Sequence, residues 1–177
     1  MAARRVVTGR AADGKGHVVS DGPAPCVLAT EDVPGFQTVY VWATDAVPHV
    51  PNAGADPTRL DQKFFPGPEG SRFLINVFPL GFGAAPGHAA GAGPHGDVFM
   101  HATSTIDYGV VLRGEVTLIL DSGEEVTLRA MDTVVQNGTV HGWRNASAEP
   151  AIVAFVVLGA EAAEASSPRD EVEGAAR

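Results

Sequence analysis

One short polar stretch is the starting point for predicting the fold: His101-Ala-Thr-Ser-Thr-Ile-Asp107. Side chains of a strand point alternately to its two faces, so the sequence predicts that His101, Thr103, Thr105 and Asp107 share one face. A polar row of this kind either faces solvent or lines a cavity that needs polar groups, and this stretch alone leaves both interpretations open. A histidine and a carboxylate on one face are candidate metal ligands or acid–base groups.

A second polar stretch, Gln136-Asn-Gly-Thr-Val-His141-Gly-Trp-Arg-Asn145, lies further along the chain. The same alternation places His141 and Trp143 on one face of a predicted strand. Asn137-Gly138 is a typical hairpin turn. His141 is either a packed or surface imidazole or a second ligand, because no histidine spacing in the chain matches a zinc finger or a metalloprotease.

Working outward, the sequence predicts short strands separated by turns and almost no helix. The expected strands cover residues 6–9, 17–22, 38–44, 72–78, 98–105, 107–112, 115–120, 125–129, 133–135, 140–144 and 151–158. Asp13-Gly14 and Asp121-Ser-Gly123 are expected turns, whereas the proline-rich segment 45–71 and the Gly/Ala-rich segment 79–96 are expected loops. Many short strands at this spacing favour a β-sandwich or a small barrel.

Composition sets the class of protein. The chain has 177 residues, 45% of them hydrophobic, which predicts one globular domain. A single cysteine, Cys26, excludes an intrachain disulfide. Twelve Lys and Arg against 21 Asp and Glu give a net charge of -9, which argues against binding to nucleic acid or to an anionic membrane. No apolar run reaches the roughly 20 residues that span a bilayer, and no signal peptide is recognisable, so we expect a soluble cytoplasmic protein.

The two polar stretches together resemble the two motifs of the cupin superfamily. The first motif, His-x-His followed by Glu and a later Gly, is matched in spacing by His101, Thr103, Asp107 and Gly114. The second, Pro-x-Gly followed by His and Asn, is matched by Gln136, Gly138, His141 and Asn145. The resemblance covers roughly residues 97–158 and is to the small single-domain bacterial cupins.

This resemblance implies an all-β fold, the double-stranded β-helix or jelly-roll barrel, in a single domain. Residues 1–96 would supply N-terminal strands and loops that complete the barrel. Residues 97–158 would form the cupin motif core. The Ala/Glu-rich tail at 159–177 is expected to be a frayed helix or disordered.

Cupins hold a divalent metal with three histidines and a glutamate, and the resemblance carries three of these positions onto His101, Asp107 and His141. Thr103 replaces the second histidine, and Thr is a poor ligand for Fe, Zn, Mn or Ni. Two histidines and one carboxylate still suit a metal with open coordination positions. The alternative is a site without metal, in which Asp107 is a general base or pairs with a histidine. His95, in the Gly-rich loop, is a further candidate imidazole.

Four residues are candidate substrate-binding groups. Arg72 has a planar fork that could clamp a carboxylate. Trp143 could form an apolar wall, Gln136 could donate a hydrogen bond, and Thr103 replaces a ligand. Each also has a structural interpretation, as a surface arginine, a core aromatic, a turn residue or a solvent-facing hydroxyl.

We therefore expect a metal-dependent small-molecule enzyme with Asp107 and His141 as catalytic residues. It would act on a small oxo or hydroxy acid or a polyketide-like molecule as a lyase, dehydratase, cyclase or isomerase. A non-haem iron dioxygenase and a non-catalytic small-molecule-binding cupin are the alternatives. The resemblance also implies a homodimer, with residues 6–9 and 17–22 available to cover a barrel edge.

Overall fold

The structure, a computed structural model, describes residues 3–29, 31–83 and 98–162. Within these ranges the regular elements are antiparallel strands. They are β1 (Arg4–Arg10), β2 (Gly16–Pro23), β3 (Cys26–Ala29), β4 (Gln37–Thr44), β5 (Ser71–Phe78), β6 (Thr105–Arg113), β7 (Glu115–Leu120), β8 (Glu125–Arg129), β9 (Thr133–Asn137), β10 (His141–Arg144) and β11 (Ala151–Gly159). None of the described residues belongs to a helix that is long and apolar enough to cross a membrane.

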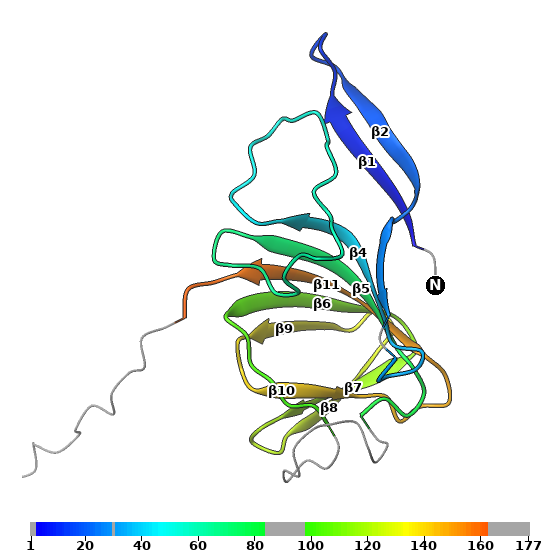
Figure 1. Cartoon of the computed structure of the whole chain (residues 1–177). Coiled ribbons are helices and arrows are strands. Elements are labelled where there is room, and N and C mark those ends of the chain that lie inside the picture. The colour runs from blue at the N-terminus through cyan, green and yellow to red at the C-terminus, as the bar shows by residue number, and fades with distance from the viewer. Residues whose placement is uncertain (1–2, 30, 84–97, 163–177) are drawn as a thin grey trace, which may run out of the picture.

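Two sheets face each other and enclose the core. The larger has the strand order β3-β4-β5-β11-β6-β9, and the smaller has the order β10-β7-β8. Figure 1 shows the smaller sheet lying below the larger one, with their inner faces opposed. Inward side chains of both sheets, among them Leu74, Val116, Leu118 and Phe155, form one apolar cluster. The predicted all-β jelly-roll barrel is confirmed.

The N-terminal half contributes to both the barrel and a separate element. Strands β3, β4 and β5 join β11, β6 and β9 in one sheet, so this part of the chain completes the barrel. Strands β1 and β2 instead form a two-stranded sheet of their own, which projects from the barrel in Figure 1. The expectation that they cover a barrel edge is thus corrected for the single chain: β3 and β9 remain the outermost strands of the larger sheet.

Two local predictions around the polar stretches are wrong for the same reason. Residues 98–104 do not form a strand, because the chain here passes from the smaller sheet, where His101 makes an isolated bridge to His141, to the larger sheet at Thr105. Asn137-Gly138 is a turn but not a hairpin. Strand β9 before it pairs with β6, and β10 after it pairs with β7, so the turn connects the two layers.

The other turns follow the local sequence. Asp13-Gly14 closes the β1–β2 hairpin and Gly14 has a φ of 84°, a conformation that glycine adopts without strain. Residues 121–123 close the β7–β8 hairpin in the same way. The short strand β3, directly after Pro25, was not predicted; its pairing with β4 is a tertiary contact that four residues of local pattern do not reveal.

Candidate functional site

A cavity of about 510 Å³ lies between the two sheets. Most of its wall is aromatic and aliphatic, and aromatic rings from both halves of the chain contribute to it. The polar residues that line it are Asn76, His101, Thr103, Asp107, Gln136 and His141. A concave, mostly apolar site with a few convergent polar groups is the usual form of a small-molecule site.

Two histidines sit side by side at one end of this cavity. The bridge between His101 and His141 is closed by two backbone hydrogen bonds, of 2.8 Å and 2.9 Å, which hold the residues directly opposite each other. Their ring centroids are 4.5 Å apart. Nδ1 of His141 lies 2.9 Å from the carbonyl oxygen of Thr139. Because a carbonyl only accepts, this contact places the proton on Nδ1 and leaves Nε2 with a lone pair.

Asp107 and Gln136 are direct partners across β6 and β9, with both side chains on the inner face. Both are more than nine-tenths buried. Among the described residues, Oδ1 of Asp107, Nε2 of Gln136 and Nδ1 of His101 are buried polar atoms without a hydrogen-bond partner. Beside them, the hydroxyls of Thr103 and Thr105 hydrogen-bond to each other at 2.7 Å. Unpaired buried polar atoms are costly in an apolar interior, so three of them at one place indicate a site that binds something.

Burial dominates the electrostatics of this end of the cavity. It lowers the pKa of His101, an effect that the Phe99 backbone and the charge of Asp107 oppose. It lowers the pKa of His141 too, with the Thr139 backbone opposing and His101 adding to the decrease. It raises the pKa of Asp107, against the Thr105 hydroxyl and His101. Both imidazoles therefore keep their lone pairs near neutral pH.

The lowered histidine pKa values predict that the metal-free fold is less stable in weak acid. The pKa of each histidine is lower in the folded state than its unfolded value of 6.5. Below that pH the unfolded state binds more protons than the folded state, so the stability that is present above pH 6.5 is lost as the pH falls. We expect the urea midpoint of the chelator-treated protein to fall between pH 7.5 and pH 5.5. The midpoint should fall less in His101→Gln than in the parent protein. In His17→Gln, whose side chain is exposed, it should fall as much as in the parent protein. An equal fall in all three proteins would contradict this assignment.

A divalent metal, which the cupin resemblance implies, fits this site only in part. His101 and His141 fit as a ligand pair: they are adjacent, their lone pairs are available, and a backbone carbonyl orients one ring as in known metal sites. Asp107 offers an unpartnered carboxylate oxygen. However, no group of three His, Cys, Asp or Glu side chains in the described ranges is arranged to hold a metal ion. His88 and His95 lie outside the described residues.

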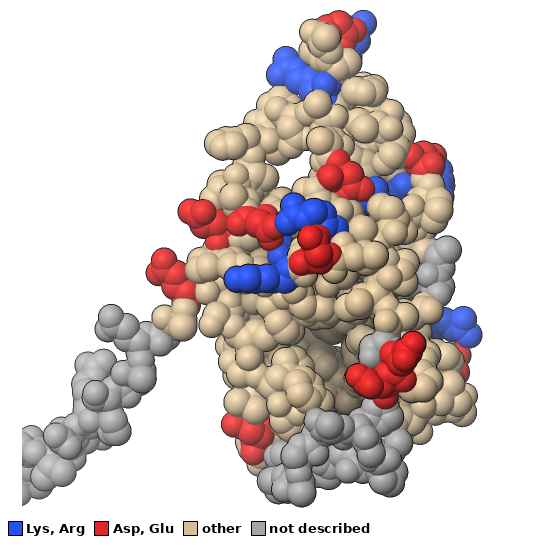
Figure 2. Space-filling model, in the orientation of Figure 1, with Lys and Arg blue, Asp and Glu red and all other residues tan. Residues whose placement is uncertain are grey.

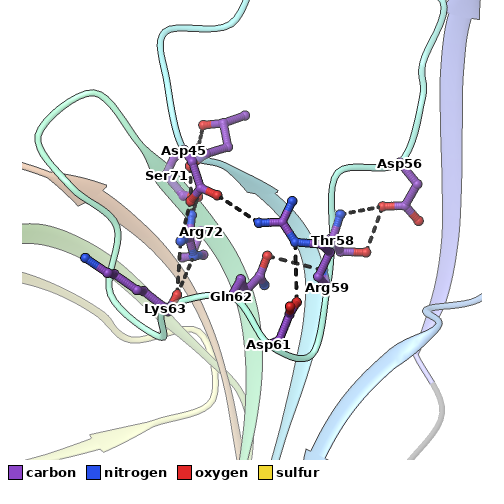
Figure 3. Close-up of polar contacts among 10 residues, drawn as sticks. Asp45, Asp56, Thr58, Arg59, Asp61, Gln62, Lys63, Ser71 and Arg72 are labelled. Carbon is purple, nitrogen blue, oxygen red and sulfur yellow. Dashed lines mark hydrogen bonds and ion pairs between the residues drawn. The ribbon is translucent and has the colours of Figure 1, made fainter.

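Arg72 makes structural contacts in the fold, and its role in substrate binding stays a prediction. Arg72 on β5 and Asp107 on β6 both pair with Val157 of the intervening strand β11, so the three side chains share the inner face of the sheet. Its guanidinium is fully buried and turns toward the loop between β4 and β5 (Figure 3). There it donates to the carbonyl oxygens of Thr44, Ser71 and Lys63 and to the carboxylate of Asp45. It does not line the cavity.

Figure 2 shows groups of opposite charge side by side on the surface of the molecule. Arg59, for example, pairs with Asp45 at 3.5 Å and with Asp61 at 3.4 Å in the loop before β5. The cavity differs: among its described lining residues Asp107 is the one acidic group, and no Lys or Arg is present. An anionic ligand would find no side-chain cation there.

The structure brings the remaining candidates together. Thr103, Gln136 and Trp143 line the same cavity as the two histidines, although their roles in binding stay predictions. Sequence reasoning expected the strand of Arg72 and Asn76 to border the cavity but gave no role to Asn76, a buried amide on β5 that lines it. It also missed Phe64 and Phe65, which reach the cavity from the proline-rich loop. An adjacent pair of large aromatics in a loop otherwise rich in polar residues and proline was the available signal.

Comparison with known proteins finds a family match for one segment of the chain. The model of the Cupin_2 family, described as a cupin domain, matches residues 87–157. The phomopsin biosynthesis cluster protein C' of Diaporthe leptostromiformis is 57% identical over 54 residues, 30% of this chain and 29% of that protein. The cupin-domain-containing oxidoreductase srdD of Neurospora crassa is 41% identical over 69 residues, 37% of this chain and 35% of that protein. These matches thus span about a third of each relative.

A search of solved structures finds KdgF from a Halomonas species with a TM-score of 0.43 and 17% identity, over 75% of this chain and 86% of that one. This likeness is slight and assigns no function. The match to the family model coincides with the two polar stretches and with the barrel strands that carry them. Residues 87–157 of this chain are thus similar to a cupin domain.

Proposed function

We propose that this protein is an enzyme that acts on a small, uncharged, largely apolar molecule with an oxo or hydroxy group. The observation that carries the proposal is the convergence of His101, Asp107 and Gln136, each with an unpartnered buried polar atom, at one end of an aromatic cavity. In the metal-free site, a carboxylate ligand would meet Asp107 and no Lys or Arg among the described lining residues, so that form of the site favours a polyketide-like ketone over an oxo or hydroxy acid.

Within this proposal, each residue has a chemical role. The amide of Gln136 donates to a substrate oxygen and orients it. His141, with its proton fixed on Nδ1 by Thr139, presents Nε2 as a hydrogen-bond or proton acceptor. Asp107, whose pKa burial raises, holds or moves a proton beside that oxygen. The aromatic walls exclude water from the same space. These roles suit proton transfer next to a carbonyl, as in a lyase, dehydratase, cyclase or isomerase.

A divalent metal is the second component of the proposal. When it is bound, the lone pairs of His101 and His141 would hold it, with Asp107 as the predicted third donor, in place of the proton-accepting roles given above, and the metal would supply Lewis-acid polarisation of the substrate oxygen. Which metal binds, among Fe, Zn, Mn and Ni, decides the class of reaction. Two relatives are named cupin-domain-containing oxidoreductases, and these names favour a redox reaction as the alternative.

The test is metal content by mass spectrometry on protein purified without an affinity tag. We expect about one equivalent of a transition metal in the parent protein and a loss of most of it in the double variant His101→Ala, His141→Ala. The matched control is the double variant His17→Ala, His49→Ala, which removes two exposed histidines and should keep the metal. No metal in the parent after reconstitution would overturn the metal-dependent function and leave a metal-free acid–base enzyme or a binding protein.

We expect the protein to act as a homodimer in the cytoplasm. Both statements come from the cupin resemblance and from composition, and both stay predictions.

A further inference from the structure

Asn76 is a buried polar residue that the proposed chemistry does not use. It lies on β5 with its side chain lining the cavity, and 9% of its surface is exposed. Its Oδ1 atom is buried and has no hydrogen-bond partner in the part of the chain that the structure describes. Thr38, directly opposite it on β4 and completely buried, also has an unpartnered hydroxyl. These two unpaired groups on neighbouring strands mark a second polar point on the inner face of the larger sheet.

This point is far from the histidine end of the cavity. On β11, the partner of Asn76 is Val153, whereas the partner of Asp107 is Val157, four residues along the strand. Strand β5 is also separated from β6 by β11. With a rise of ~3.3 Å per residue and a strand spacing of ~4.8 Å, the two Cα atoms are on the order of 15 Å apart. Asn76 and Asp107 therefore cannot contact the same small polar group.

Aromatic rings connect the two ends. Phe36, Phe78 and Phe82 pack against one another with centroids 5.1 to 5.7 Å apart, and Phe78 follows Asn76 on the inner face of β5. The Phe78 ring centroid is 6.1 Å from that of Trp143, which in turn is 6.0 Å from that of His141. The cavity between the polar ends is thus walled by a continuous series of aromatic contacts.

We propose that Asn76 forms a distal polar subsite of this cavity, so that the ligand is an elongated, uncharged molecule with a flat apolar body and a hydrogen-bonding group at each end. One end meets His101, Asp107 and Gln136, and the other meets the Asn76 amide. A hydroxyl suits the distal end, because it can both donate to Oδ1 and accept from Nδ2. This inference rests on the proposed function only in that the cavity holds the substrate.

Binding of two rigid aromatic probes, measured by isothermal titration calorimetry, tests the subsite. 4,4'-Biphenol has a hydroxyl at each end, whereas 4-phenylphenol has one hydroxyl only. Symmetry alone gives biphenol an advantage of about twofold, since it can enter in two orientations. With one added hydrogen bond at Asn76, we expect the parent protein to bind biphenol about 5- to 10-fold more tightly than phenylphenol.

In Asn76→Leu and in Asn76→Ala, the preference should fall to about the twofold statistical value. Both variants remove the amide, so one folded variant is enough. Ile75→Val, on the opposite face of the same strand, is the matched control and should keep the preference. A parent protein without the preference, or a folded Asn76 variant that keeps it, would overturn the subsite. If neither probe binds at all, the uncharged apolar substrate of the proposed function fails as well, whereas equal binding of both probes refutes the subsite alone.

Discussion

Replacing Arg72 by methionine is expected to destabilise the fold by about 3 kcal/mol or more, because it leaves several buried carbonyl oxygens without a donor. The guanidinium of Arg72 is fully buried and makes hydrogen bonds to the backbone of Thr44, Ser71 and Lys63 at 2.7 to 3.1 Å. Its ion pair with Asp45 contributes little to this figure, since the Asp45 side chain is 57% exposed. Methionine keeps the apolar stem, so the variant isolates the lost hydrogen bonds.

Urea unfolding of the parent protein and the variant measures this effect. The matched control is Arg59→Met, on the same loop, whose side chain is 61% exposed and whose ion pairs are on the surface. It should change the free energy of unfolding by less than about 0.5 kcal/mol. A loss of less than about 1 kcal/mol in Arg72→Met would mean that the loop does not depend on this residue. A specific loss of ligand binding without loss of stability would support Arg72 as a substrate-binding residue.

Substituting Gly159 by alanine should cost about 3 kcal/mol, through a steric clash between backbone segments. A Cβ atom on Gly159, at the end of β11, would lie 1.7 Å from the carbonyl oxygen of Gly67. The two segments are also joined by a hydrogen bond of 3.0 Å from the Gly159 amide to the carbonyl of Gly70. Alanine therefore forces the 67–70 turn away from the central strand of the larger sheet, and no side-chain rotation can relieve the contact.

Gly22→Ala is the matched control for this prediction. Gly22 lies in β2, and a Cβ atom there would meet nothing within 4 Å. We expect its thermal midpoint to remain within about 2 °C of the parent value, whereas Gly159→Ala should lower the midpoint by about 6 °C or more. Similar midpoints for the two variants would show that the 67–70 turn is free to move.

Local sequence predicted the elements that depend on local interactions. The alternating β-branched and apolar residues of 115–120 and 125–129 became β7 and β8 with the predicted bounds, and 121–123 became their hairpin turn. The shared face of Thr105 and Asp107 was predicted from the same alternation, because the two-residue period of a strand is set by the backbone itself. The resemblance to the cupin motifs implied the jelly-roll barrel, which the strand pairing confirms.

Tertiary structure decided what those side chains meet. Arg72 shares its row with Asp107, yet a long side chain can reach either the cavity or the neighbouring loop, and buried carbonyls in the loop bind it. The bridge between His101 and His141 joins two sheets, so no local pattern predicts their adjacency. Asn76 and the aromatic pair Phe64 and Phe65 enter the cavity from the other half of the chain. Sequence alone predicted which residues share a face, because that is a property of one strand, whereas the packing of the two sheets decided which face is buried and which side chains meet.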